Sequence, residues 1–167
     1  MPNSQLIRGV VMMKYLLLLI LSFCTVSLYA QTNPSLSMAL ANKMVLAAAQ
    51  QCENDGYKVS VAVVDKGGVI LAQVRMDGAG VHTIESSFRK AYTSASMRMS
   101  TQKLAQIAAK DPELQGLHRL GNNILILGGG LPITLNGEVI GGIGIGGAPG
   151  TQFDEACAEA GLKVFRN

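Results

Sequence analysis

Residues 59–76 read VSVAVVDKGGVILAQVRM, the most informative stretch of the sequence for the fold class. The segment 59–65 is rich in β-branched valine, and the segment 69–76 continues the apolar pattern after a Lys-Gly-Gly turn. Two apolar runs separated by a short glycine-containing turn are typical of a β-hairpin. The stretch therefore predicts two adjacent antiparallel strands.

Around this hairpin, the spacing of the apolar residues changes to the period of a helix. Before it, Asn33 and Pro34 offer an N-cap and a first helical residue, and Gly56 offers a C-terminal stop. The predicted helical segments are residues 34–55, 83–99, 101–110, 112–118 and 152–165.

Three further apolar runs lie between the last two helical segments: ILIL (124–127), LPITL (131–135) and EVIGGIGIG (138–146). Asn136 and Gly137, between the second and third runs, form the strongest short hairpin signal in the sequence. With the first hairpin, these runs predict an α+β fold with the element order α-β-β-α-α-β-β-β-α. In this fold, helices pack on an antiparallel sheet of about five strands.

The segment 13–31, MKYLLLLILSFCTVSLYAQ, has a composition of its own. A single Lys14 precedes an apolar run, and Ala30 offers a small residue at its exit, which is typical of a secretory signal peptide. The apolar part, residues 15–28, is short against the roughly 20 residues that span a bilayer. We therefore expect cleavage near Ala30 instead of a membrane anchor. The sequence predicts a periplasmic or secreted protein with no membrane attachment after cleavage.

The chain of 167 residues is long enough for one ordinary domain besides this leader. We expect residues 1–30 to form an N-terminal extension with the signal peptide, and residues 31–167 to form a single domain. Loss of Arg8 and Lys14 with the leader reduces the 14 basic residues to 12, against 11 acidic ones. This near-neutral balance leaves no basic stripe, and nucleic acid is therefore not expected as a partner.

Cysteine usage leaves two possibilities open. Cys24 lies in the predicted leader, and Cys52 and Cys157 remain in predicted helices far apart in the sequence. An oxidising compartment would allow these two to pair. Small buried thiols are the simpler interpretation, and the sequence favours them.

The glycine motifs do not indicate a nucleotide site. Gly142, Gly144 and Gly147 match a G-x-G-x-x-G pattern, but they lie in the last predicted strand instead of opening a βαβ unit. Close packing within the sheet explains them better. The glycine run 128–130 lacks the residues of a Walker loop and joins two predicted strands, where it allows a ligand or a partner subunit near the backbone. GxSxG, HExxH and CxxC motifs are absent from the sequence.

The chain has two histidines, His82 and His118. His82 stands between the glycine-rich turn 77–80 and a predicted helix, with Glu85 on the same helical face. Two histidines do not complete a zinc site, although Glu85 offers one more ligand. The competing interpretation is an exposed first turn, in which Glu85 is favourable near the positive helix end. The residues alone leave both interpretations open.

Several segments coincide with one family in their joint spacing: VAVVD, RMDGAG, RKAYT, GGGLPI, GGIGIGG and DEACAEAG. Over residues 36–165 the sequence resembles the GlcG/HbpS-like haem-binding (haem-degrading) family. The resemblance implies a profilin-like α+β fold, assembly into homo-oligomers, and binding of haem or a related tetrapyrrole. Secreted relatives of this kind are linked to haem sequestration, haem breakdown and redox sensing with a membrane sensor protein. The predicted signal peptide groups this chain with them.

The resemblance also implies a ligand region, formed by the glycine-rich turn, the helix after it, and the loop before GGG. In this region the cationic Arg89 and Lys90 would pair with haem propionates. Glu85 is followed three residues on by Phe88, so the acidic pair of some secreted relatives is not present here. The residues expected to contact the cofactor are His82, Thr83, Glu85, Arg89, Lys90, His118, Asn122 and Asn123. The expected haem-iron ligand is His82 or His118.

The sequence thus favours an exported haem-binding protein that acts in haem sequestration, degradation or redox sensing. The alternative is an extracytoplasmic small-molecule-binding or sensor-partner module in which Lys90 and the glycine-rich turn hold a small organic acid. The sequence supplies no dedicated redox constellation, so an enzyme is not the favoured interpretation. Any haem breakdown would then be peroxide-driven chemistry of the bound iron.

Overall fold

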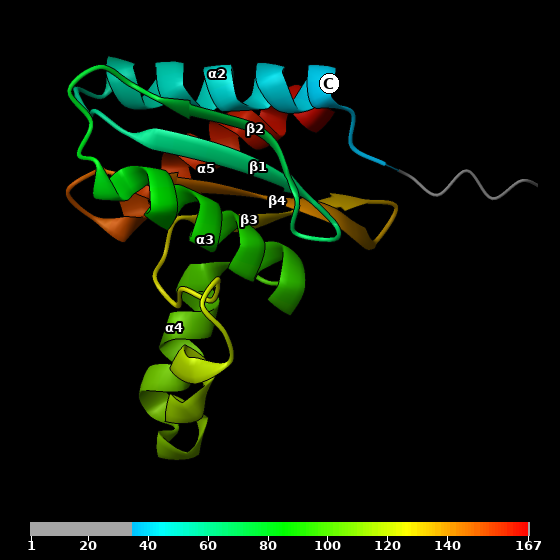
Figure 1. The fold of residues 1–167 in the computed structure, drawn as a ribbon, viewed down its shortest axis with the longest axis vertical. Coiled ribbons are helices and arrows are strands. Elements are labelled where there is room, and N and C mark those ends of the chain that lie inside the picture. The colour runs from blue at the N-terminus through cyan, green and yellow to red at the C-terminus, as the bar shows by residue number, and fades with distance from the viewer. Residues whose placement is uncertain (1–34, 167) are drawn as a thin grey trace, which may run out of the picture. The chain divides into compact units, whose positions relative to one another are not determined.

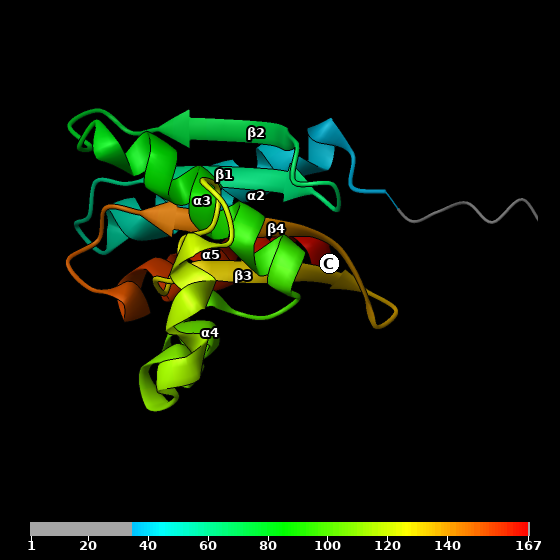
Figure 2. The ribbon, with the colours of Figure 1, turned by 60° about the horizontal axis from the view of Figure 1, so that its bottom comes forward.

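The computed structural model describes residues 35–166, and its centre is a four-stranded antiparallel sheet in the order β2-β1-β4-β3 (Figures 1 and 2). The strands are β1 Ser60–Asp65, β2 Ile70–Arg75, β3 Gly130–Leu135 and β4 Glu138–Gly146. The helices are α2 Met38–Asn54, α3 His82–Met97, α4 Thr101–Lys110, the 3-10 helix η1 Pro112–Arg119, and α5 Thr151–Arg166. None of these described helices is long and apolar enough to cross a membrane.

The predicted signal peptide and the predicted cap at Asn33 and Pro34 lie outside the described residues. The first described helix, α2, begins later than the sequence predicted, at Met38. Its N-cap is Ser37, whose Oγ accepts a hydrogen bond from the Leu40 amide at 3.2 Å. The helix ends where the sequence predicted, because Gly56 takes the left-handed conformation at φ +83°.

Both predicted hairpins are confirmed. β1 and β2 pair antiparallel, with Ser60 opposite Arg75. Between β3 and β4, Asn136 and Gly137 have φ values of +51° and +83°, the positive values that a two-residue turn of this kind needs. β1 also pairs with β4, so the two hairpins form one sheet. The α+β class is therefore confirmed.

The predicted strand over residues 124–127 is wrong, and the sheet has one strand fewer than predicted. In this segment the backbone bonds to side chains of α3. The Leu125 amide donates to Thr93 Oγ1 at 2.8 Å, and Arg89 Nη2 donates to the Ile124 carbonyl at 2.8 Å. The apolar side chains complete a small core with α4, formed by Leu104, Ala108, Ile124 and Ile126. A short apolar run does not by itself distinguish a strand from such a cover segment.

Two hydrophobic layers hold the sheet. α2 and α5 cover one face, and α3 covers the other (Figure 1). Successive residues of β1 alternate between the layers, because side chains of a strand point to opposite faces. Val61 and Val63 join the larger cluster under α2 and α5, whereas Ala62 and Val64 join the smaller cluster under α3. All four are fully buried, as expected for a central strand.

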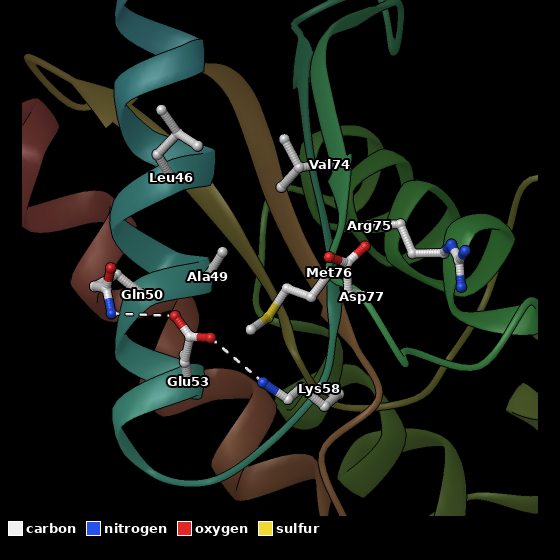
Figure 3. Close-up of a pocket in the computed structure, with 9 residues that line it drawn as sticks. All are labelled: Leu46, Ala49, Gln50, Glu53, Lys58, Val74, Arg75, Met76 and Asp77. Carbon is white, nitrogen blue, oxygen red and sulfur yellow. Dashed lines mark hydrogen bonds and ion pairs between the residues drawn. The ribbon is translucent and has the colours of Figure 1, made fainter.

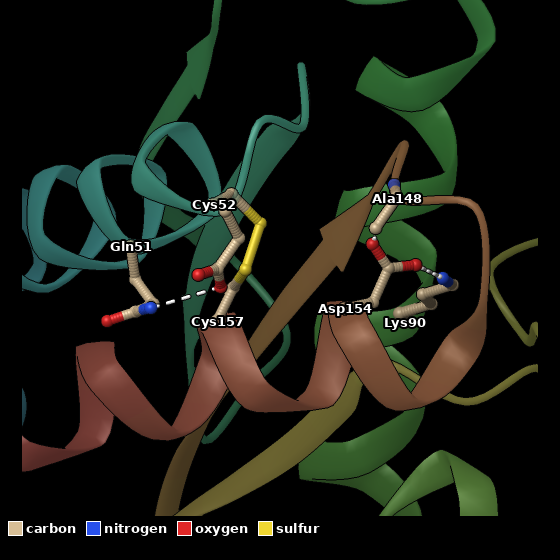
Figure 4. Close-up of a disulfide and its surroundings, with 7 residues drawn as sticks. Gln51, Cys52, Lys90, Ala148, Asp154 and Cys157 are labelled. Atoms are coloured by element: carbon tan, nitrogen blue, oxygen red, sulfur yellow. Dashed lines mark hydrogen bonds and ion pairs between the residues drawn. A yellow bond between two sulfur atoms is a disulfide. The ribbon is translucent and has the colours of Figure 1, made fainter.

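A disulfide joins Cys52 of α2 to Cys157 of α5 (Figure 4). The sequence favoured two free thiols, and this prediction is wrong. The two helices pack side by side on the same face of the sheet, which brings the two Cα atoms to 5.5 Å, within the usual range for a disulfide. Both residues are fully buried, so the bond lies inside the larger hydrophobic layer.

α3 lies directly on the backbone of β4. At Gly142 and Gly144, an added Cβ would collide with main-chain atoms of Ala91 and Ser87. Close helix–sheet packing therefore explains these glycines, as the sequence predicted. The glycine run 128–130 serves the same purpose, because atoms of α3, α4 and α5 fill the space beside it. This run is therefore not an open approach for a ligand, and the packing fixes which face of α3 meets solvent.

Candidate functional site: the solvent face of α3 and the loop after η1

The turn before α3 is fastened by its own side chains. Arg75 Nη1 donates to the Ala79 carbonyl at 2.5 Å, and Thr83 Oγ1 donates to the Gly80 carbonyl at 2.6 Å. Thr83 Oγ1 also lies 2.7 Å from Ser60 Oγ, and Thr83 is 1% exposed. Thr83 therefore ties the turn to β1 and does not face the surface that a ligand reaches.

Three of the predicted site residues share one side of α3. His82, Glu85 and Arg89 follow the i, i+3, i+7 spacing that places side chains on one helical face. His82 is exposed, and the Glu85 side chain is 74% exposed. Glu85 Oε1 lies 3.4 Å from Arg89 Nη1. His82 lies about 10 Å from Arg89 along the helix axis, so one extended ligand is needed to span them.

Arg89 has hydrogen-bonding capacity that the chain does not use. Its Nη2 donates to the Ile124 carbonyl at 2.8 Å, which ties α3 to the loop after η1. Its Nε is buried and has no hydrogen-bond partner within residues 35–166. A buried N–H without an acceptor costs free energy. The Arg89 side chain is 28% exposed, and this exposed part of the guanidinium can donate to a carboxylate.

Lys90 points away from this surface. It is 2% exposed, and its Nζ donates to Asp154 Oδ2 at 2.7 Å (Figure 4). Asp154 Oδ1 also accepts from the Ala148 amide at 3.1 Å. Burial raises the pKa of Asp154, and the charge of Lys90 partly opposes this shift. The pair ties α3 to α5 inside the protein, and Lys90 does not reach the surface where a propionate or organic acid would bind.

Asn122 and Asn123 lie in the loop after η1 and line a depression of about 350 Å³ beside α3. The other residues lining this depression are Tyr92, Ser96, Met97, Leu120, Gly121 and Ile124. Its volume lies at the lower end of the range for small-molecule sites. The structure therefore brings the loop asparagines against the C-terminal half of α3, whereas His82 stands at the other end of that helix.

His118 is exposed on η1 and lines a separate depression with Gln115, Gly116 and Arg119. The two histidines thus lie on different elements, and His82 does not line the depression beside His118. Within the described part of the chain, no group of three or more His, Cys, Asp or Glu residues is placed to hold a metal ion. His82 and Glu85 therefore remain a pair without a third ligand for zinc.

A pocket of about 380 Å³ between α2 and β2 was not predicted from the sequence (Figure 3). Leu46, Gln50 and Glu53 line it from the helix, and Val74 lines it from the strand. Glu53 also pairs with Lys58 at 3.3 Å. The pocket exists only because α2 packs beside the edge strand β2, so no local motif marks it.

The described residues define a class of small α+β domains, in which a helix packed on a glycine-rich strand presents polar side chains to solvent. The chain belongs to the HbpS-like family. The family described as "Haem degrading protein HbpS-like" matches residues 36–163.

Two solved structures and one curated relative place the chain within this family. A crystal structure of a double mutant of HbpS from Streptomyces reticuli is 40% identical, with a TM-score of 0.73 over 78% of this chain and 87% of that one. The crystal structure of a PduOC:Heme complex is 27% identical, with a TM-score of 0.72 over 78% of this chain and 95% of that one. Protein GlcG of Escherichia coli K12 is 30% identical over 69% of this chain and 84% of its own length. The family expected from the sequence is thus confirmed.

Proposed function

We propose that the protein is an exported haem-binding protein, and that the solvent face of α3 contacts the cofactor. Membership of the HbpS-like family and the likeness to a relative crystallised with haem support this proposal. The observation that carries it is the row on one helix of exposed His82, exposed Glu85 and half-buried Arg89. The row offers an imidazole for iron and a guanidinium for a propionate.

The side chains around this row fit a flat, largely apolar ring. Val81 is 79% exposed and Ile84 is 40% exposed, so two apolar side chains lie at the start of α3 beside His82. Arg89, whose side chain is 28% exposed, would donate hydrogen bonds from its guanidinium to a carboxylate of the ligand. Bound haem would supply a redox-active iron, and the residues of this chain would ligate the iron, pair with the propionates and shield the ring.

A second subunit fits the same proposal. A helix surface covers only one face of a flat ring, and a buried cofactor needs contacts on both faces. We therefore propose that the protein works as a homo-oligomer in which a second copy covers the other face. A membrane sensor protein remains the proposed downstream partner if the protein acts in redox sensing.

Export is supported by the N-terminal sequence and by the buried disulfide, because disulfides form and persist in oxidising compartments. Cell fractionation and the N-terminal mass of the mature protein test this part. Cleavage near Ala30 is expected, whereas full-length protein in the cytoplasm would contradict export.

The haem proposal is tested by titrating the purified protein with hemin and following the Soret band. His82→Ala is expected to change the band position or weaken binding, and Arg89→Gln to weaken binding without moving the band. Lys103→Gln, an exposed site on α4, is the matched surface control. If His118→Ala alone abolishes the band shift, the iron ligand is His118 on η1 instead of His82. No shift in the wild-type protein would refute haem binding.

Two other functions are weaker. Lys90 is not available to bind an organic acid, because it is buried in an ion pair with Asp154. Haem breakdown, which the family description names, is proposed only as peroxide-driven chemistry of the bound iron. Product analysis with and without catalase separates this from enzymatic degradation, because catalase removes the peroxide.

A further inference from the structure

A further pocket, with mostly polar lining residues, lies at the other end of α3 from His82. It is bounded by the turn between β1 and β2, the C-terminal end of α3, and the hairpin between β3 and β4. Its volume is about 570 Å³, within the range of small-molecule sites. The residues that line this Lys66–Arg98 pocket are Lys66, Ala95, Ser96, Arg98, Glu138 and Val139.

Two cations face the pocket from different elements. Lys66 and Arg98 are exposed, and neither forms an ion pair with another residue in the described range 35–166. Glu138 also lines the pocket, and within residues 35–166 it forms no ion pair with either cation. The lining thus carries one net positive charge, with a serine hydroxyl and a carboxylate as further polar groups.

The backbone of Arg98 gives an independent indication. Arg98 is the C-cap of α3 and takes the left-handed conformation, with φ +55° and ψ +33°. Glycine is strongly favoured for this conformation at a helix end, because a side chain there is strained. In the described chain, Asn136 is the other residue besides glycine with positive φ, and asparagine tolerates it in a hairpin turn. The backbone at Arg98 is therefore locally strained, and the strained residue carries a guanidinium at this pocket. Such local strain is typical of functional positions.

We propose that the Lys66–Arg98 pocket binds a small organic oxyanion, specifically a hydroxylated carboxylate. The two cations would pair with the carboxylate, and the Ser96 hydroxyl would donate to it. Glu138 would accept a hydrogen bond from a hydroxyl group of the ligand, and it disfavours a compact, highly charged anion by like-charge repulsion. The two cations of this pocket lie away from His82, because Arg98 follows His82 by about 24 Å of helix. Ser96 also lines the depression beside Asn122 and Asn123, so the pocket adjoins that depression.

The proposal is tested by isothermal titration calorimetry on the purified haem-free protein, with malate and inorganic phosphate as probes in a low-salt amine buffer. Malate is expected to bind, and to bind more weakly at physiological ionic strength, because exposed charges are screened there. Lys66→Gln and Arg98→Gly are each expected to weaken malate binding by about tenfold, the loss expected for one charge-assisted hydrogen bond. Lys103→Gln, which removes an exposed lysine elsewhere, is the matched control and should bind as the wild type does.

Arg98→Gly separates a lost ligand contact from a damaged fold. Glycine relieves the left-handed strain, so this variant is expected to melt at a higher temperature while losing malate binding. Wild-type binding in Arg98→Gly, or an equal loss in Lys103→Gln, would overturn the proposal. Binding of phosphate without malate would overturn the carboxylate assignment. Hemin titration of the same variants is expected to give the wild-type Soret band. The two titrations therefore test the malate site and the haem site independently of each other.

Discussion

The disulfide between Cys52 and Cys157 gives the sharpest stability prediction. The two residues are 105 positions apart, so the bond closes a loop that contains most of the described chain. Loop-closure entropy for this separation predicts that the bond stabilises the folded protein by about 4.8 kcal/mol at 25 °C. This figure is a large fraction of the roughly 5–15 kcal/mol that stabilises an ordinary domain.

The perturbation is reduction of the bond, and the assay is urea denaturation followed by circular dichroism. The protein is compared after refolding with and without dithiothreitol, and thiol titration verifies each state. For a typical urea m-value of about 2 kcal/mol/M, the midpoint should fall by about 2 M on reduction. The double variant Cys52→Ala/Cys157→Ala should show a similar midpoint with no effect of dithiothreitol, apart from a small packing loss.

Two results would refute this reasoning. The first is an unchanged midpoint in protein that thiol titration proves to be reduced, because the bond would then contribute little to stability. The second is two titratable thiols in the unreduced, denatured protein, because the bond would then not form.

Three further predictions concern the packing of α3 on the sheet and its buried ion pair. Gly144→Ala should destabilise the protein by about 3 kcal/mol or more in thermal and urea unfolding, because its Cβ would collide with the backbone of α3. Gly116→Ala is the matched control, since no atom lies within 4 Å of its added Cβ, and an equal loss in both variants would contradict the packing argument. Lys90→Ala should cost about 3–5 kcal/mol, because it leaves the Asp154 carboxylate buried without its partner. Burial raises the pKa of Asp154 in the folded state above its ordinary value of 3.8, so the folded protein holds this proton more tightly than the unfolded chain does. The contribution of Asp154 to stability should therefore decrease as the pH rises from 3.8 through the raised pKa. The stability of wild type relative to Asp154→Asn, measured by urea unfolding across this range, should fall accordingly, and a rise would show that the attraction of Lys90 exceeds the cost of burial.

Much of the fold was predictable because its signals are local. The valine-rich β1, its glycine turn and β2 are consecutive in the chain, so the first hairpin depends on few distant contacts. Asn136 and Gly137 tolerate the positive φ that the second hairpin needs. The joint spacing of six short segments also identified the family correctly. The roles of His82 and His118, the leader, and haem itself remain predictions.

The sequence alone was enough to predict the two hairpins, the helices, the α+β class and the family, since each depends on short-range pattern. Long-range packing is what makes residues 124–127 cover α4 instead of forming a strand. Long-range packing also brings Cys52 to Cys157 and buries Lys90 beside Asp154. These outcomes depend on which distant segments pack together, and burial is a property of the packed assembly. The sequence alone therefore does not reveal which of the adjacent residues Arg89 and Lys90 faces water.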